Sequence, residues 1–191
     1  ADGPTHAGRC DTTYWTTLPN FIVMAASDEA ELVRMINTST EINDCPCAFR
    51  YPRGTGLGSV LPTINEKIEI GKSKIIQEGK DITIVGIGFT VKKIMDCKQE
   101  LSVLNIDPEI IDLRLLNPID YSSIINSVKK TKRLVVVDGD WSSCGLASEI
   151  ITSVVESVNP QDLISKPKRV TLVDAPAPTS KYLENDYYIS T

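Results

Sequence analysis

The chain has 191 residues, of which 41% are hydrophobic and 24% charged, and its formal net charge is −5. This length and balance are typical of a folded protein of one domain or slightly more, and they argue against disorder. The negative charge and the lack of a Lys/Arg-rich run argue against nucleic acid as a partner. No apolar run approaches the roughly 18 residues of a membrane-spanning helix, and the N-terminal segment lacks the pattern of a secretory signal.

The five cysteines show no spacing typical of a metal site. The closest two, Cys45 and Cys47, would point to opposite faces of an extended segment, which suits neither a disulfide nor a shared metal. An odd number of cysteines in a non-secretory chain predicts reduced thiols with packing roles. We therefore expect no metal ligands in this chain, and a cytoplasmic location or, alternatively, the matrix of a plastid-type organelle.

The N-terminal part predicts one strand–helix–strand unit. Residues 1–20 carry turn signals without a regular period and are predicted to form a loop. Residues 21–25 and 47–51 are predicted to be buried strands, and residues 28–43 the helix between them. Two strands and one helix bury too little surface to fold alone. The missing strands are therefore expected from polypeptide that precedes this chain or from another chain.

A stretch rich in Gly, Pro and small polar residues follows at 54–66 and predicts a linker. We place the linker at 59–66. The chain is then divided into the end of one domain at 1–58 and a complete domain at 67–191.

The second domain alternates predicted strands with predicted helices. The strands are expected at 71–78 (an edge strand), 82–88, 110–113, 134–138 and 170–173, and the helices at 90–104, 119–131 and 144–158. This alternation predicts an α/β fold with a mostly parallel sheet wound on both faces. The tail after Asp174 contains two prolines and three tyrosines, so we expect it to pack rather than to form a free linker.

Candidate catalytic and binding residues lie in the N-terminal unit. His6 is the only histidine, and an imidazole can perform acid–base chemistry near neutral pH. It lies in a loop bounded by Gly and Pro, with Asp2 four residues earlier, and loops at the carboxyl edge of parallel sheets often bind ligands. The alternative for a single histidine is a surface or packing role.

Two arginines follow the second predicted strand. Arg53, between Pro52 and Gly54, projects from the carboxyl end of that strand, where its guanidinium could bind a phosphate or carboxylate through paired hydrogen bonds. The alternative for Arg50 and Arg53 is a surface salt bridge, and local features do not separate the two. The segment Gly86-Ile87-Gly88 lacks the third glycine of a dinucleotide site and is interpreted as a tight turn.

The segment Asp2-Gly3-Pro4-Thr5-His6 resembles the DGPTH motif of the transketolase superfamily of thiamine-diphosphate enzymes. Further segments resemble the 1-deoxy-D-xylulose-5-phosphate synthase family more closely than transketolase itself; they lie at residues 8–11, 18–20, 23–32 and 50–54. Residues 1–58 thus look like the last third of a pyrimidine-binding domain. From about Ile70 the chain resembles the transketolase C-terminal domain. Within that domain, residues 129–137, 144–150 and 174–178 resemble the β subunit of 2-oxoacid dehydrogenases.

This resemblance implies a transferase that uses thiamine diphosphate and Mg²⁺. The enzyme would condense pyruvate with glyceraldehyde 3-phosphate, with loss of carbon dioxide, to 1-deoxy-D-xylulose 5-phosphate for isoprenoid synthesis. His6 would be catalytic, as a donor to the developing oxyanion or a proton shuttle. Asp2 and His6 would contact the substrate and Arg53 would bind its phosphate, while Arg50 is less securely matched and could be structural.

The resemblance also implies that the cofactor and the metal are bound mainly by residues upstream of this chain. It therefore assigns no cofactor-binding residue to these 191 residues. The chain alone would be inactive and would need the N-terminal portion or a partner chain that supplies it, and the C-terminal domain would build a homodimer without contributing a catalytic residue. Two alternatives stay open: part of a 2-oxoacid dehydrogenase or another transketolase-like enzyme, and a non-catalytic dimerisation module.

Overall fold

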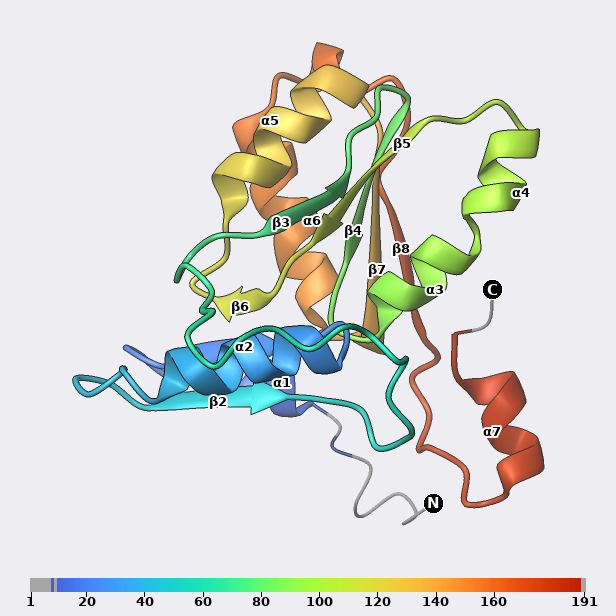
Figure 1. Ribbon diagram of the computed structural model, residues 1–191. Coiled ribbons are helices and arrows are strands. Elements are labelled where there is room, and N and C mark those ends of the chain that lie inside the picture. Colours follow the sequence, from blue (N-terminus) through green and yellow to red (C-terminus); the bar gives the residue numbers. More distant parts are fainter. Residues whose placement is uncertain (1–7, 9, 190–191) are drawn as a thin grey trace.

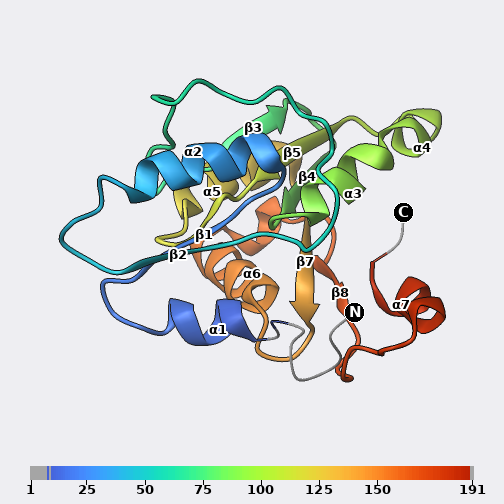
Figure 2. The same cartoon turned by 60° about the horizontal axis from the view of Figure 1, so that its bottom comes forward.

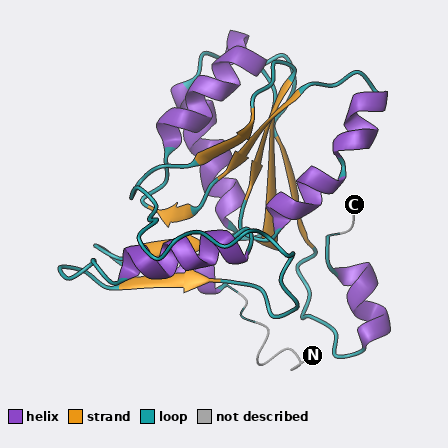
Figure 3. Ribbon diagram, in the orientation of Figure 1, coloured by secondary structure: helices purple, strands orange, loops and turns teal. Residues whose placement is uncertain are grey.

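The computed structural model describes residue 8 and residues 10–189, and it contains two β-sheets (Figure 1). A three-stranded sheet has the order β2-β1-β6, and a five-stranded sheet has the order β3-β5-β4-β7-β8. Figure 3 shows helices on both faces of the larger sheet and the smaller sheet lying across one end of it. Within the described residues, no helix combines the length and the apolar character that crossing a membrane requires.

The elements in chain order are α1 (Asp11–Thr16), β1 (Ile22–Ala25), α2 (Glu29–Ser39), β2 (Cys47–Arg50), β3 (Lys74–Gln77), β4 (Ile82–Gly86), α3 (Thr90–Asp96), α4 (Lys98–Val103), β5 (Pro108–Asp112), β6 (Leu115–Asn117), α5 (Tyr121–Thr131), β7 (Leu134–Trp141), α6 (Leu146–Ser157), the short 3₁₀ helix η1 (Pro160–Asp162), β8 (Lys168–Leu172) and α7 (Lys181–Tyr187).

The five-stranded sheet is mostly parallel, as predicted. Strands β4, β5, β7 and β8 pair in parallel, and β3 is an antiparallel edge strand. Neighbouring residues of β4 point to opposite faces: Val85 packs in the core cluster with Ile150, whereas Ile84 packs in the cluster with Ile94. Because helices cover both faces of the sheet, apolar side chains on either face of the central strand β4 are buried.

The three-stranded sheet joins the two predicted domains. Strand β1 pairs in parallel with β2 and antiparallel with β6, a strand of the second domain that the sequence did not predict. Met24 of β1 packs in the cluster with Met35 of α2, whereas Val23 belongs to the main core of the larger sheet. One neighbour for β1 therefore comes from residues 67–191 of this chain, and for that strand the prediction of a source in preceding polypeptide or another chain is wrong. The two parts share a core.

The helices depart from the prediction in several places, and α2 ends at Ser39 instead of residue 43. The helix expected at 90–104 is divided into α3 and α4 at Cys97; all six residues of α4, each of them described, are at least partly exposed, so packing on the sheet does not hold α4 in line with α3. The loop expected at 1–20 contains α1, and the tail contains α7. Helices this short are marginal in isolation, so tertiary contacts must hold them.

Candidate active site

A cavity of about 660 Å³ opens where the two sheets meet. Its lining residues come from both predicted domains and are Gly8, Asp11, Ala25, Ala26, Arg50, Tyr51, Pro52, Arg53, Gly54, Ile87, Gly88, Phe89, Ala177, Pro178, Glu184 and Tyr188. This volume is typical of a small-molecule site.

The cavity lies at the carboxyl ends of three strands. Strand β1 ends at Ala25, β2 at Arg50 and β4 at Gly86, and the residues that follow each strand line the cavity. Gly88 has a φ of 57°, and a Cβ atom there would lie 3.4 Å from the Cβ of Ala25. A glycine is favoured at this turn, because it adopts a left-handed backbone without strain and adds no Cβ beside Ala25. The tight turn interpreted from Gly86-Ile87-Gly88 thus brings β4 and β1 together at the cavity.

Arg53 lies three residues beyond the end of β2, is exposed and lines the cavity. A guanidinium in this position can bind an anionic group through two hydrogen bonds at once. Asp2 and His6, the other two predicted site residues, lie outside the described residues. Their roles, and that of Arg53, stay predictions.

Arg50 is occupied by contacts within the protein. Its Nε lies 3.3 Å from Oδ2 of Asp11, its Nη1 lies 4.0 Å from Oδ2 of Asp140, and its Nη2 donates a hydrogen bond to the Gly8 carbonyl at 3.1 Å. These contacts tie the end of β2 to α1, to β7 and to the loop at Gly8. The sequence left two interpretations of Arg50 open, an anion-binding residue and a member of a salt bridge. These contacts agree with the salt bridge.

Two buried aspartates on β7 continue this network. Asp140 accepts hydrogen bonds from Thr12 Oγ1 at 2.7 Å and from the Trp141 amide at 3.2 Å. Asp138 accepts from the amides of Asp140 and Ala147, each at 3.1 Å. Burial raises the pKa of Asp138 to about 6, despite these amide donors. The pKa of Asp11 is also raised, first by burial, although Arg50 opposes the shift.

Sequence reasoning missed this network because its members are far apart in the chain. Thr12 and Asp140 are separated by 128 positions. One signal was present: Asp138 and Asp140 directly follow the apolar run 134–137 and continue the same strand. Buried carboxylates in a central strand require partners, so these two residues could have been listed as candidates without their partners being known.

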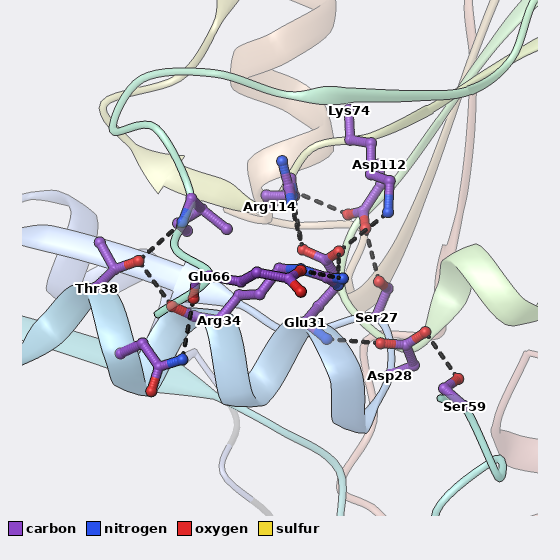
Figure 4. Close-up of polar contacts among 12 residues, drawn as sticks. Ser27, Asp28, Glu31, Arg34, Thr38, Ser59, Glu66, Lys74, Asp112 and Arg114 are labelled. Atoms are coloured by element: carbon purple, nitrogen blue, oxygen red, sulfur yellow. Dashed lines mark hydrogen bonds and ion pairs between the residues drawn. The ribbon is translucent and has the colours of Figure 1, made fainter. Parts of the chain in front are cut away.

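A second polar cluster holds the two parts of the chain together (Figure 4). Glu31 of α2 is 2% exposed, and its carboxylate lies 2.6 Å from Nη2 of Arg114, 3.1 Å from Nζ of Lys74 and 3.0 Å from Nη1 of Arg34. Burial by itself would raise the pKa of Glu31, but Arg114 and Lys74 outweigh it and hold the pKa below its usual value. The cluster therefore anchors α2 to the larger sheet.

Asp112, at the end of β5, lies beside this cluster. Its Oδ2 accepts a hydrogen bond from Ser27 Oγ at 2.6 Å and its Oδ1 accepts from the Arg114 amide at 3.1 Å. Complete burial raises the pKa of Asp112 to about 7, because these donors and the Arg114 charge only partly compensate for the loss of water. The Arg50 network therefore includes residues that line the cavity, whereas the Glu31 cluster and Asp112 lie outside its lining.

Among the described residues, no cluster of metal-ligating side chains is present for the diphosphate–Mg²⁺ end of thiamine diphosphate. Within residue 8 and residues 10–189, no three His, Cys, Asp or Glu side chains converge to hold a metal ion, and Mg²⁺ bound to a diphosphate requires oxygen ligands. The cavity is lined by the guanidinium of Arg53, which can bind a single anionic group.

Comparison with known families matches residues 71–191 to the transketolase C-terminal domain. Residues 1–56 match the transketolase pyrimidine binding domain. Among solved structures, the chain is similar to one described as "Split gene transketolase, inactive beta4 tetramer", with a TM-score of 0.82 and 25% sequence identity. The match covers 97% of this chain and 59% of that chain, so the present chain spans less than two thirds of its neighbour. With matches to both of these domains, the chain belongs to the transketolase family.

Proposed function

We propose that this chain is part of a thiamine-diphosphate-dependent transferase that condenses pyruvate with glyceraldehyde 3-phosphate, with loss of carbon dioxide, to 1-deoxy-D-xylulose 5-phosphate. Domains of this family typically belong to thiamine-diphosphate-dependent transferases. The observation that carries the proposal is the position of Arg53 in the cavity at the ends of β1, β2 and β4. A phosphorylated acceptor needs a cation at such a place, and a guanidinium matches a phosphate well.

Each residue then has a distinct role. When bound, thiamine diphosphate would supply the electron sink that stabilises the carbanion left when a 2-oxoacid loses carbon dioxide. Arg53 binds the phosphate of the acceptor, Asp2 accepts a hydrogen bond from a substrate hydroxyl, and His6 donates a proton or hydrogen bond to the developing alkoxide. Arg50 acts indirectly: its guanidinium donates to the Gly8 carbonyl and so holds the backbone at Gly8, which follows His6 by two positions in the sequence.

The cofactor, with Mg²⁺, is held mainly by polypeptide beyond these 191 residues. That polypeptide is part of the same protein or of a partner chain, and the chain by itself is inactive and forms a homodimer in the complete enzyme. The solved neighbour supports the need for a partner, because it is described as an inactive tetramer of a split-gene transketolase.

The test is an assay of the complete protein with thiamine diphosphate, Mg²⁺, pyruvate and glyceraldehyde 3-phosphate. Product formation is expected. Arg53→Ala should raise KM for glyceraldehyde 3-phosphate by at least about tenfold, since a charge-assisted hydrogen bond contributes about 1.5–3 kcal/mol. KM for pyruvate should not change. Arg133→Ala, which removes an exposed arginine bonded to the Asp81 carbonyl far from the cavity, is the control. Absence of product, or equal effects of the two variants, would contradict the proposal.

A second candidate is the β-subunit-like part of a 2-oxoacid dehydrogenase. It is supported by residues 129–137, 144–150 and 174–178, which resemble that subunit. Reduction of a lipoyl domain by the complete protein, with no use of glyceraldehyde 3-phosphate, would favour this candidate. A non-catalytic dimerisation module is the third reading, and it would be favoured if neither reaction occurred.

A further inference from the structure

The last residue of strand β7, Trp141, forms hydrogen bonds that hold the C-terminal segment, residues 175–188, against the strand. Trp141 Nε1 donates hydrogen bonds to the Ala175 carbonyl at 3.1 Å and to the Tyr187 hydroxyl at 3.0 Å. The Tyr187 hydroxyl in turn donates to the Ala175 carbonyl at 2.7 Å. These three bonds join β7, the chain after β8 and α7. The seven residues of α7, all described, are each at least partly exposed, so polar contacts of this kind help to hold the helix.

This attachment places part of the C-terminal segment at the cavity. Figure 1 shows α7 below the carboxyl ends of the strands of the larger sheet, and Figure 2 shows it beyond the end of β8. Glu184 and Tyr188 line the same cavity as Arg53. The Tyr188 ring packs edge-on against Tyr187, with ring centroids 5.1 Å apart. The second domain thus contributes titratable and hydroxyl groups to a cavity whose predicted site residues all came from the first.

We propose that residues 177–188 form a specificity-determining wall of the acceptor pocket, in which Glu184 and Tyr188 select a ligand with one phosphate and a hydroxylated, uncharged remainder. Trp141 and Tyr187 are positioning residues that hold this wall in place. The proposal rests on the proposed function, since it takes the cavity to be the acceptor site and Arg53 to be its phosphate-binding group.

The charges around the cavity give this selectivity its physical basis. Arg53 attracts one anionic group, whereas a second anionic group in the same cavity would meet the carboxylate of Glu184. Like charges in a partly desolvated cavity repel each other strongly. A carboxylate and a phenol are both good partners for a substrate hydroxyl, and a site built to bond a hydroxyl rejects ligands that lack one. A phosphorylated hydroxyaldehyde has the required combination, and a bisphosphate does not.

The first test measures binding to the complete protein by calorimetry. The probes are inorganic phosphate, glycerol 3-phosphate and propane-1,3-diol bisphosphate. The wild type should prefer glycerol 3-phosphate to the other two. In Glu184→Gln, the preference for glycerol 3-phosphate over the bisphosphate should fall by about tenfold, as expected for the loss of one charge. In Tyr188→Phe, the preference for glycerol 3-phosphate over inorganic phosphate should fall by about fivefold, as expected for the loss of one hydrogen bond.

Matched controls are available at exposed positions outside the cavity lining. Tyr182→Phe changes another tyrosine of α7 that is 79% exposed, and Glu156→Gln changes an exposed glutamate of α6; both should bind like the wild type. Tyr187→Phe tests positioning. In the complete enzyme it should raise KM for the aldehyde without changing KM for pyruvate or kcat, whereas a merely structural role would change all three.

The outcomes separate this inference from the proposed function. If Glu184→Gln and Tyr188→Phe keep the wild-type preferences while Arg53→Ala loses phosphate binding, the wall does not select the acceptor and the inference is wrong. The inference is also wrong if the wild type binds glycerol 3-phosphate no better than inorganic phosphate. If Arg53→Ala binds all three probes like the wild type, the proposed function itself is contradicted.

Discussion

Arg50 and Asp140 face each other across the boundary between the two predicted domains, with Nη1 of the arginine 4.0 Å from Oδ2 of the aspartate. The same strand end carries Trp141, which fastens α7. One strand of the larger sheet, β7, therefore orients both walls of the cavity: the wall from β2 through Asp140 and the wall from the C-terminal segment through Trp141. This arrangement leads to tests in which the stability of the chain is the readout.

Thr12→Val tests the hydrogen bond that links α1 to β7. Thr12 is 1% exposed and donates to Asp140 at 2.7 Å, and valine has the same shape without the hydroxyl. A hydrogen bond to a charged group contributes about 1.5–3 kcal/mol, so the free energy of unfolding should fall by that amount. Thr17→Val is the control, because Thr17 is exposed and its hydroxyl donates a local hydrogen bond to the Tyr14 carbonyl. Urea denaturation of both variants measures the difference, and equal midpoints would contradict the role given to Thr12.

Glu31→Gln tests the cluster that anchors α2. The substitution leaves Arg114, Lys74 and Arg34 around a neutral amide, and removal of one partner from a buried ion pair typically costs about 3–5 kcal/mol. Glu41→Gln is the control: it removes the carboxylate of an ion pair with Lys67, and the Glu41 side chain is 62% exposed. Exposed ion pairs contribute about 0–1 kcal/mol. Thermal and urea unfolding should therefore show a large loss for Glu31→Gln and little change for Glu41→Gln.

Asp112→Asn tests the effect of pH on stability. Because the pKa of Asp112 is raised from 3.8 to about 7 in the folded chain, the unfolded chain ionises first as the pH rises. The folded state then loses stability between about pH 4 and pH 7, by at most about 4 kcal/mol for a shift of three units. Asparagine does not titrate, so the variant should gain stability relative to the wild type as the pH rises through this window.

The relative measurement also removes the contribution of Asp138, whose raised pKa affects both proteins alike. Urea unfolding at intervals from pH 4 to pH 7.5 gives the two curves. Parallel curves would mean that Asp112 is ionised in the folded chain throughout the window.

Gly139→Ala tests the support behind Phe89, a residue that lines the cavity. A Cβ atom at position 139 would lie 2.4 Å from Cε1 of Phe89, so the ring must move. Overpacking of this kind costs about 1–3 kcal/mol. Gly54→Ala is the control, because no atom lies within 4 Å of a Cβ there. Calorimetric unfolding should show a lower Tm for Gly139→Ala alone, and a crystal structure of that variant should show Phe89 displaced.

Much of the fold could be predicted because its signals are local. The runs at 82–86 and 134–137 are apolar in sequence, and both form central strands covered on both faces. Arg53 could be named as a candidate because Pro52 and Gly54 already indicate the end of a strand, where ligands commonly bind. The division of the helix at Cys97 and the presence of α1, α7 and β6 could not be predicted, since these elements depend on what packs beside them.

The sequence by itself determined the fold class, the family resemblance and the candidates Asp2, His6 and Arg53, because periodicity and motifs are properties of neighbouring residues. The tertiary structure alone decided that β6 of the second domain pairs with β1 of the first. It also decided that Arg50 lies between Asp11 and Asp140 and that Glu184 and Tyr188 reach the cavity. The physical reason is that these contacts join segments up to about 130 positions apart, where the partner of a buried charge is set by chain topology and not by local sequence.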